Sequence, residues 1–470
     1  MPSRGQHYVI LPLAAWGHLR PLLFLTFNLC ALHKDLQITF MVDPVVSPRI
    51  KVEMAEHPQP KSTLDRIQII EISEINDADM VDDLKSSGKE TMPIYLKALF
   101  TGVGLGGISP AFGPPTLAIF DWFQGGFVTS LKTVCTELGV PLIPAIIYTP
   151  MLAAGLYHFW GPMQNGGFAE RWGLESEKLM AQGVEKYEAY ERRYDKLGGT
   201  SVIIGSISLA YSRCKSGNFV IPQLSRIAIT PFWGEMVYSS YLSAHMPEVK
   251  GLLLPTLQEV EGGLVAALEE ALGKNVFAVG PQFGKDVWEG KKPDLISAKT
   301  ADVGEVDQSA LSAKKDDQVA LDFLDEQLKL KGPRSVAYIS LGSLFWPVKR
   351  PELLTYLISS LPVNLTFLLS DAAAMTGLTE EMKLSFEHRG KVVKFTPQWK
   401  VLSHPAVAFF ISHLGSNSMV ESILSEMPTI AFPFSADQSQ AAYIMCDKFK
   451  VGIELQQVRS DVDGKTRWNG

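Results

Sequence analysis

Residues 395–438 read FTPQWKVLSHPAVAFFISHLGSNSMVESILSEMPTIAFPFSADQ, and this stretch decides the fold of the second half of the chain. An apolar run at 406–411 is short enough for a buried strand. The turn at 413–418 then predicts the start of a helix that Asn417 or Ser418 caps. A helix start directly after a strand presents free N–H groups and a positive dipole end. The stretch therefore predicts a phosphate-binding edge of an α/β sheet.

The side chains of this stretch suit a sugar nucleotide. His413 is expected beside the anion, where it can donate a hydrogen bond. Asn417 and Glu421 are four residues apart and share a helix face, so the Glu421 carboxylate can accept from ribose hydroxyls. Asp437 and Gln438 follow the next predicted strand and place a carboxylate and an amide on one loop. That pair suits a polyol with several hydroxyls.

This stretch resembles the donor-site signature of the family-1 UDP-dependent glycosyltransferases. The positions that match it are Phe395, Pro397, Gln398, Leu402, His404, His413, Gly415, Asn417, Ser418, Glu421, Asp437 and Gln438. The plant branch has Trp at the positions of Phe395 and Ser416. The resemblance implies that UDP is bound by Ser343, Phe395, Gln398, His413, Gly415, Asn417, Ser418 and Glu421. It also implies that Asp437 and Gln438 bind the sugar.

A second matching segment lies near the N-terminus. Residues 7–13 predict a buried strand, and a helix is expected to begin at Pro21 and end at Leu32. His18 then falls in the loop at the carboxyl end of the strand, where open α/β sheets bind ligands. Gly17-His18-x-x-Pro21 resembles the family's N-terminal motif, which implies that His18 is the general base.

Asp121 follows another predicted strand, at 116–120. From the residues alone, an Asp at this position is either a helix cap or a site residue. The resemblance implies that Asp121 orients His18.

Aromatic residues gather between positions 148 and 172, and two interpretations stay open. They pack in the core, or they line an apolar acceptor pocket, since such pockets are lined by aromatic side chains. Trp16, Phe123 and Tyr148 are assigned to the predicted acceptor pocket.

The resemblance implies an inverting transfer of a sugar from a UDP-sugar to a hydroxyl of a small apolar or aromatic acceptor, such as a phenol, flavonoid, sterol or other alcohol. Gln438 favours glucose as that sugar, because most family members with Gln there use UDP-glucose. UDP-sugar is a co-substrate, and no metal or other cofactor is expected. A non-catalytic sugar-nucleotide-binding protein and a nucleotide-sugar epimerase of the same fold stay as alternatives.

The resemblance also implies the GT-B fold, in which two Rossmann-like, doubly wound domains with parallel sheets face each other. The predicted domains are 1–283, which binds the acceptor, and 319–470, which binds the UDP-sugar. The polar stretch 284–318 is predicted to be a linker. The helix with which family members return to the first domain is expected to be missing.

Composition excludes several classes. The net charge of −7 over 470 residues offers no basic face for nucleic acid. The 4 cysteines are scattered, which fits a reducing compartment, and no segment looks like a signal or a membrane span. A cytoplasmic protein is predicted.

Two short motifs are rejected. The acidic pairs Asp77-Ala78-Asp79 and Asp461-Val462-Asp463 lie in polar stretches and are not expected to bind metal. The glycines of 102–107 precede a predicted strand, whereas a dinucleotide fingerprint follows one, so NAD is not expected.

Overall fold

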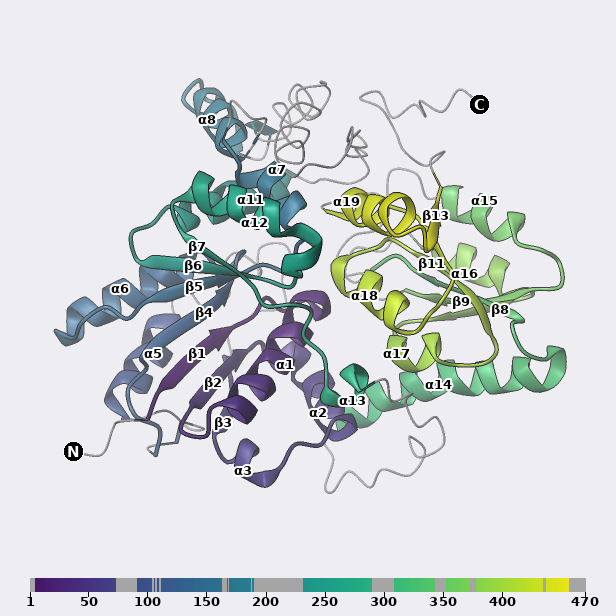
Figure 1. Ribbon diagram of the computed structural model, residues 1–470, viewed down its shortest axis with the longest axis horizontal. Helices are drawn as coiled ribbons and strands as arrows, with labels where there is room; N and C mark the ends of the chain where they lie inside the picture. The colour runs from purple at the N-terminus through teal and green to yellow at the C-terminus, as the bar shows by residue number, and fades with distance from the viewer. Residues whose placement is uncertain are drawn as a thin grey trace. The chain divides into compact units, whose positions relative to one another are not determined.

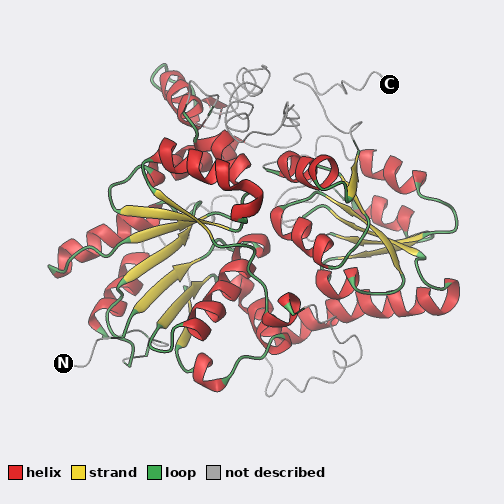
Figure 2. Cartoon of the chain, viewed as in Figure 1, coloured by secondary structure: helices red, strands yellow, loops and turns green. Residues whose placement is uncertain are grey.

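The computed structural model describes residues 5–72, 91–162, 167–189, 231–289, 308–342, 352–371, 378–433 and 437–455, except for 104, 106, 107, 110, 168 and 187. The chain divides into two compact units, with a division between Phe283 and Gly284. Each unit contains a parallel sheet accompanied by helices, drawn in yellow and red in Figure 2. This confirms the predicted fold class of two doubly wound α/β units.

The first unit has a seven-stranded sheet in the order β3-β2-β1-β4-β5-β6-β7 (Figure 1). Its strands are β1 (His7–Leu11), β2 (Gln37–Val42), β3 (Ile67–Glu71), β4 (Leu117–Asp121), β5 (Ala145–Tyr148), β6 (Val249–Leu254) and β7 (Asn275–Ala278). All neighbours pair in parallel. The order reverses between β1 and β4, and such a switch point is where open α/β sheets bind ligands.

Helices connect these strands. They are α1 (Trp16–Leu32), α2 (Ser47–Glu56), α3 (Lys61–Leu64), α5 (Met92–Thr101), α6 (Gly126–Leu138), α7 (Ala153–Trp160), α8 (Ala169–Met180), α11 (Pro231–Ala244) and α12 (Gln258–Leu272). One hydrophobic core of the unit forms where α1 packs on β1 and β2, through side chains such as Leu22, Phe27 and Phe40. These apolar side chains explain why the segment folds as strand, helix and strand.

The start of α1 differs from the prediction. A helix was expected from Pro21, but α1 begins at Trp16 and contains Pro21. The backbone N–H groups of His18 and Leu19 already donate to the Ala15 carbonyl, which closes the first turn. The loop after β1 is therefore short, and His18 is held on a helix rather than on a loop.

The second unit has a six-stranded sheet in the order β10-β9-β8-β11-β12-β13. Its strands are β8 (Val336–Ser340), β9 (Thr366–Ser370), β10 (Gly390–Val393), β11 (Val407–Ser412), β12 (Thr429–Ala431) and β13 (Gly452–Glu454). The helical elements are α13 (Lys285–Trp288), α14 (Gln308–Lys331), α15 (Glu352–Ser360), α16 (Glu380–Phe386), α17 (Gln398–Leu402), α18 (Ser416–Leu424), α19 (Gln438–Ala442) and a π-helical turn (Tyr443–Lys448). The switch point of this sheet lies between β8 and β11.

Two further predictions need correction or stay open. Helix α14 begins at Gln308, inside the stretch 284–318 that was predicted to be a linker, so the end of that stretch is helical. Its Lys, Asp, Gln and Ala residues are compatible with a helix even without an apolar period. The tail at 456–470, where no returning helix was expected, lies outside the described residues.

Candidate active site

His18 and Asp121 meet at the switch point of the first unit. His18 Nδ1 lies 2.7 Å from Asp121 Oδ2, although the residues are far apart in the sequence. His18 is in the first turn of α1, directly after β1, and Asp121 is the last residue of β4. Because β1 and β4 are parallel neighbours, their carboxyl ends bring the two side chains together.

The surroundings of Asp121 show which atom donates in the hydrogen bond between the two side chains. Asp121 Oδ1 accepts from the Phe123 N–H at 3.0 Å, and Asp121 itself is fully buried. A buried carboxylate accepts, so His18 Nδ1 donates the proton of this contact and Nε2 of a neutral ring is left without one. The His18 side chain is 8% exposed. This arrangement can take a proton at Nε2 and stabilise the imidazolium that forms.

The three residues assigned to the acceptor pocket differ in position. The Phe123 ring stacks beside His18 with 5.7 Å between ring centroids. Trp16 is half-buried, and the Arg49 guanidinium lies 5.5 Å from its ring centroid. Tyr148 is fully buried within the core of the first unit. The assignment of Tyr148 to a pocket wall therefore needs correction, because its side chain presents no surface to a ligand here.

The aromatic residues that follow Tyr148 also pack in the core. The described members that are buried are Tyr157, Phe159, Trp160 and Trp172, and Phe168 lies outside the described residues. Trp122 contacts two of them, with ring centroids 6.1 Å from Phe159 and 5.7 Å from Trp160. Between core packing and an acceptor-pocket wall, the burial of these side chains supports core packing.

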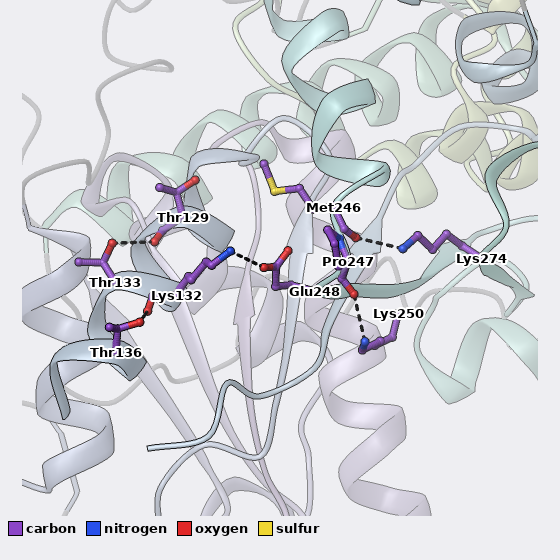
Figure 3. A network of polar contacts seen from close by, with 9 residues as sticks. All are labelled: Thr129, Lys132, Thr133, Thr136, Met246, Pro247, Glu248, Lys250 and Lys274. Carbon is purple, nitrogen blue, oxygen red and sulfur yellow. Dashed lines mark hydrogen bonds and ion pairs between the residues drawn. The ribbon is translucent and has the colours of Figure 1, made fainter. Parts of the chain in front are cut away.

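A surface cavity of about 460 Å³ lies where β6 and β7 begin. This is the amino-terminal end of the seven-stranded sheet, whereas His18 and Asp121 lie at the carboxyl ends of its strands. Two of its lysines, Lys250 and Lys274, donate to the backbone carbonyls of Pro247 and Met246 (Figure 3). Lys132 pairs with Glu248 nearby. The cavity is thus separate from the His18–Asp121 pair.

In the second unit, His413 is packed between two glycines at the switch point. It follows β11, and its backbone N–H donates to the Ser340 carbonyl at the end of β8. A Cβ atom at Gly342 or at Gly415 would lie 2.6 Å from His413 Nε2. Gly342 also has a φ of +92°, which favours glycine. The imidazole of His413 therefore leaves no room for a side chain at either glycine.

Burial lowers the pKa of His413 to about 4, against the opposing effect of a hydrogen bond to the Ser340 backbone carbonyl. The ring is neutral at pH 7, so it can offer a hydrogen bond to an anion but no full positive charge. Gly415 is the N-cap of α18, and no side chain caps this helix. The predicted caps Asn417 and Ser418 are wrong, because both residues lie inside the helix.

The Gln398 side chain joins two other residues of the predicted nucleotide site. Its Nε2 donates to Glu421 Oε2 at 2.6 Å and to Ser418 Oγ at 3.0 Å. Its Oε1 accepts from the Tyr338 hydroxyl at 3.2 Å, and that hydroxyl is 2.6 Å from Thr396 Oγ1. Sequence reasoning missed Tyr338 and Thr396. These two residues are identified as part of the site only by the hydrogen bonds from Tyr338 to Gln398 and between Tyr338 and Thr396.

The other residues that were predicted to bind the donor differ in burial. Phe395 and Asn417 are half-buried. Asp437 is the N-cap of α19, Gln438 is the first residue of this helix, and both are buried. Ser343 lies outside the described residues.

His404 matches the family signature but has a structural role. The Ala406 N–H donates to His404 Nδ1 at 3.2 Å, and Nε2 lies 3.3 Å from Asp325 Oδ1. Burial lowers the pKa of His404, and the Asp325 carboxylate opposes this shift. The neutral ring therefore fixes the turn before β11 rather than a ligand.

Among the described residues, no group of three or more His, Cys, Asp or Glu side chains could hold a metal ion. The acidic pairs at 77–79 and 461–463 lie outside the described residues. Within the described ranges, no helix is both long and apolar enough to cross a membrane.

Comparison with known proteins connects the second unit to one family. Residues 288–461 match the model of the family described as UDP-glucoronosyl and UDP-glucosyl transferase. The chain is 35% identical over 165 residues to UDP-glycosyltransferase 76E1 of Solanum lycopersicum, which is 34% of each chain. It is 36% identical over 135 residues to gallate 1-beta-glucosyltransferase 84A23 of Punica granatum, covering 27% of this chain and 26% of that one. The chain spans about a third or less of the length of these relatives.

Solved structures support the fold over nearly the whole chain. The structure of Medicago truncatula UGT71G1 complexed with UDP-glucose aligns with 99% of this chain and 87% of its own, with a TM-score of 0.55 and 20% identity. Glycyrrhiza uralensis UGT73P12 aligns with 99% of this chain and 84% of its own, with a TM-score of 0.59 and 17% identity. At these identities the likeness shows the fold, which is GT-B as predicted.

Proposed function

We propose that the chain is a UDP-glycosyltransferase, because its residues 288–461 match the model of that family, and that it transfers a sugar from a UDP-sugar to a hydroxyl of a small apolar or aromatic molecule. The observation that carries the proposal is the buried contact of 2.7 Å between His18 Nδ1 and Asp121 Oδ2. A binding protein has no need of such a pair, whereas a transferase needs a base for a weakly acidic hydroxyl.

The proposed reaction is a single displacement. The acceptor oxygen attacks the anomeric carbon from the face opposite UDP, and a new glycosidic bond forms as the bond to UDP breaks. His18 Nε2 takes the hydroxyl proton, and Asp121 stabilises the resulting imidazolium. The anomeric centre is inverted, and UDP leaves with the bonding electron pair.

The departing diphosphate gains negative charge, which the N–H groups at the start of α18 are suited to stabilise. The neutral ring of His413 lies directly before this helix and can donate one hydrogen bond. Ser343, which lies outside the described residues, stays a proposed phosphate contact. The proposed stabilisation uses N–H donors and requires no metal.

Each part of the UDP-sugar has proposed contacts. Phe395 stacks on uracil, and Gln398, Asn417, Ser418 and Glu421 surround the ribose. The sugar is proposed to be glucose, because an amide such as Gln438 both donates and accepts toward adjacent equatorial hydroxyls. Asp437 accepts from the neighbouring hydroxyls. A cytoplasmic location is part of the proposal.

The test is an assay with UDP-glucose and a panel of acceptors. The panel contains phenols, flavonoids, sterols and aliphatic alcohols, together with gallic and cinnamic acids, because relatives are named for these acids. Mass spectrometry follows the glycoside and UDP. The proposal expects both products in equal amounts, with a β-linked sugar from the α-linked donor.

The alternatives give different results. A non-catalytic binding protein retains UDP-glucose and releases no UDP, whereas an epimerase changes the nucleotide sugar without any acceptor. Faster transfer from UDP-galactose or UDP-glucuronate than from UDP-glucose would contradict the assignment of the sugar.

A further inference from the structure

Tyr338 lies in the middle of β8, and its side chain is fully buried. Its ring stacks on Phe410 of β11, with centroids 4.8 Å apart and planes 13° apart. We propose that Tyr338 is a positioning residue for the nucleotide ribose, which acts through Gln398 on Glu421. This inference rests on the proposed function, in which Glu421 accepts hydrogen bonds from the ribose.

The hydrogen bonds around Gln398 fit only one order of donors. Carboxylate oxygens accept, so the Gln398 atom that lies 2.6 Å from Glu421 Oε2 must be the donor Nε2. Oε1 then faces Tyr338, which has a single proton and donates it at 3.2 Å. The Ser340 side chain also hydrogen-bonds this phenol. With its single proton given to Gln398, Tyr338 accepts from the Thr396 hydroxyl, which lies 2.6 Å from the phenol oxygen. The order is Thr396, Tyr338, Gln398, Glu421.

This order selects one orientation of the Gln398 amide. If the amide were turned over, Oε1 would face the Glu421 carboxylate, and two acceptors would meet. Nε2 would then face the Tyr338 hydroxyl, which would have to accept a hydrogen bond instead of donating one. Tyr338 therefore stabilises the orientation in which Gln398 donates to Glu421. Burial raises the pKa of Tyr338 against the opposing hydrogen bonds with Thr396 and Ser340, and the charge of Glu421 adds to the rise, so the phenol keeps the proton that it donates.

The consequence concerns the carboxylate that is proposed to meet the ribose. Glu421 is 3% exposed, and one of its oxygens is held by Gln398. That contact fixes the direction of the carboxylate plane, and a hydrogen bond to a charged group depends strongly on direction. Without Tyr338, the Gln398 amide loses a donor and holds Glu421 less firmly.

The experiment measures calorimetric binding of UDP and of 2′,3′-dideoxy-UDP to the full chain. The wild-type protein is expected to prefer UDP by about 10²-fold, since hydrogen bonds from the ribose to a carboxylate are charge-assisted. Tyr338→Phe keeps the ring that packs on Phe410 and removes only the hydroxyl. It is expected to weaken UDP binding about five- to tenfold and to leave the dideoxy nucleotide within twofold.

Tyr356→Phe is the matched control. Tyr356 lies on α15 of the same unit and is 66% exposed, so the preference for UDP should be unchanged. If Tyr338→Phe weakens both nucleotides equally, or keeps the wild-type preference, the positioning role is wrong. If the wild-type protein itself shows no preference, the ribose contact of Glu421 fails, and the role of Tyr338 fails with it.

Thr396→Val provides a second route if Tyr338→Phe does not fold. Val has the shape of Thr without the hydroxyl, and Thr396 is 4% exposed. The loss of the first donor should reduce the preference for UDP about two- to threefold in the same direction. An unchanged preference in Thr396→Val would contradict the proposed order of donors.

Discussion

At the scale of single residues, the two nitrogens of His18 have different tasks. Nδ1 gives its proton to the hydrogen bond with Asp121, so Nε2 of the neutral ring is the atom that can accept one. Asp121 is itself held by the Phe123 N–H, which keeps the carboxylate from turning. The pair is thus oriented before any acceptor arrives.

The first prediction removes the proposed base. His18→Ala should lower transfer to an alcohol acceptor by about 10²–10⁴-fold, because the hydroxyl proton has no acceptor. Acidic phenols should retain more activity, since they are partly ionised without help. Initial rates with one alcohol and one acidic phenol check this. His33→Ala, at the exposed end of the same helix, is the control. Unchanged turnover of the alcohol by His18→Ala would exclude the role.

The second prediction concerns the close packing around His413. Gly415→Ala would place a Cβ atom 2.6 Å from His413 Nε2, so the imidazole or the start of α18 must move. UDP affinity should fall about tenfold or more, because the diphosphate is proposed to bind at these N–H groups. Calorimetric titration with UDP measures it. Gly126→Ala, where an added Cβ meets nothing within 4 Å, should bind UDP as the wild type does.

At the scale of elements, a chain of polar contacts holds β1, β2 and β3 together. His7 Nδ1 donates to the Gly113 carbonyl at 2.5 Å, and Nε2 lies 2.7 Å from Thr39 Oγ1. Gln68 donates to the same Thr39 oxygen at 2.6 Å and accepts from the Ser109 N–H. His7 Nε2 must therefore stay unprotonated for Thr39 to donate to it.

The third prediction follows from the titration of His7. Burial lowers its pKa from 6.5 to about 4, against the opposing Gly113 hydrogen bond. Between these values the unfolded chain binds more protons than the folded protein, so the free energy of unfolding falls as pH drops from about 6.5 to 4. His7 contributes up to about 3 kcal/mol to this fall.

Urea unfolding of His7→Gln at pH 7 and pH 4.5 measures this contribution. The variant should be less stable than the wild type at pH 7, and the difference should shrink at pH 4.5. His33→Gln, at an exposed position, should follow the wild type at both values. A difference that is constant between the two pH values would rule out His7 as a source of the pH dependence.

At the scale of the whole molecule, the proposed base and the proposed donor site belong to different compact units. His18 and Asp121 lie in the first unit, and the residues proposed for UDP lie in the second. Changes at residues that share no partner side chains usually have additive effects. Binding of UDP and removal of the acceptor proton should therefore be separable by mutation.

The fourth prediction uses this separation. Glu421→Ala should weaken UDP binding about tenfold to a hundredfold through the loss of charge-assisted hydrogen bonds to the ribose. His18→Ala should leave the UDP dissociation constant within about twofold. The double variant should bind UDP as Glu421→Ala does. An effect of His18→Ala on UDP affinity as large as that of Glu421→Ala would show that the two sites are not independent.

The sequence by itself determined the alternation of strands and helices, and it predicted His18, Asp121 and the signature around His413 as parts of the candidate site. Apolar runs mark buried strands because parallel strands are covered on both faces, and the spacing of the signature around His413 is local. It did not determine the start of α1, where the first turn closes at Ala15 ahead of Pro21. Backbone hydrogen bonds of a turn leave little trace in side-chain patterns.

Only the tertiary structure decided which side chains meet. Strand order brings His18 to Asp121, and it places Tyr338 of β8 beside Phe410 of β11, close enough to reach Thr396 and Gln398. It also places Tyr148 in the core instead of on a pocket wall. The physical reason is that hydrogen bonds and packing depend on distances between strands that are remote in the sequence, and no local pattern of residues encodes those distances.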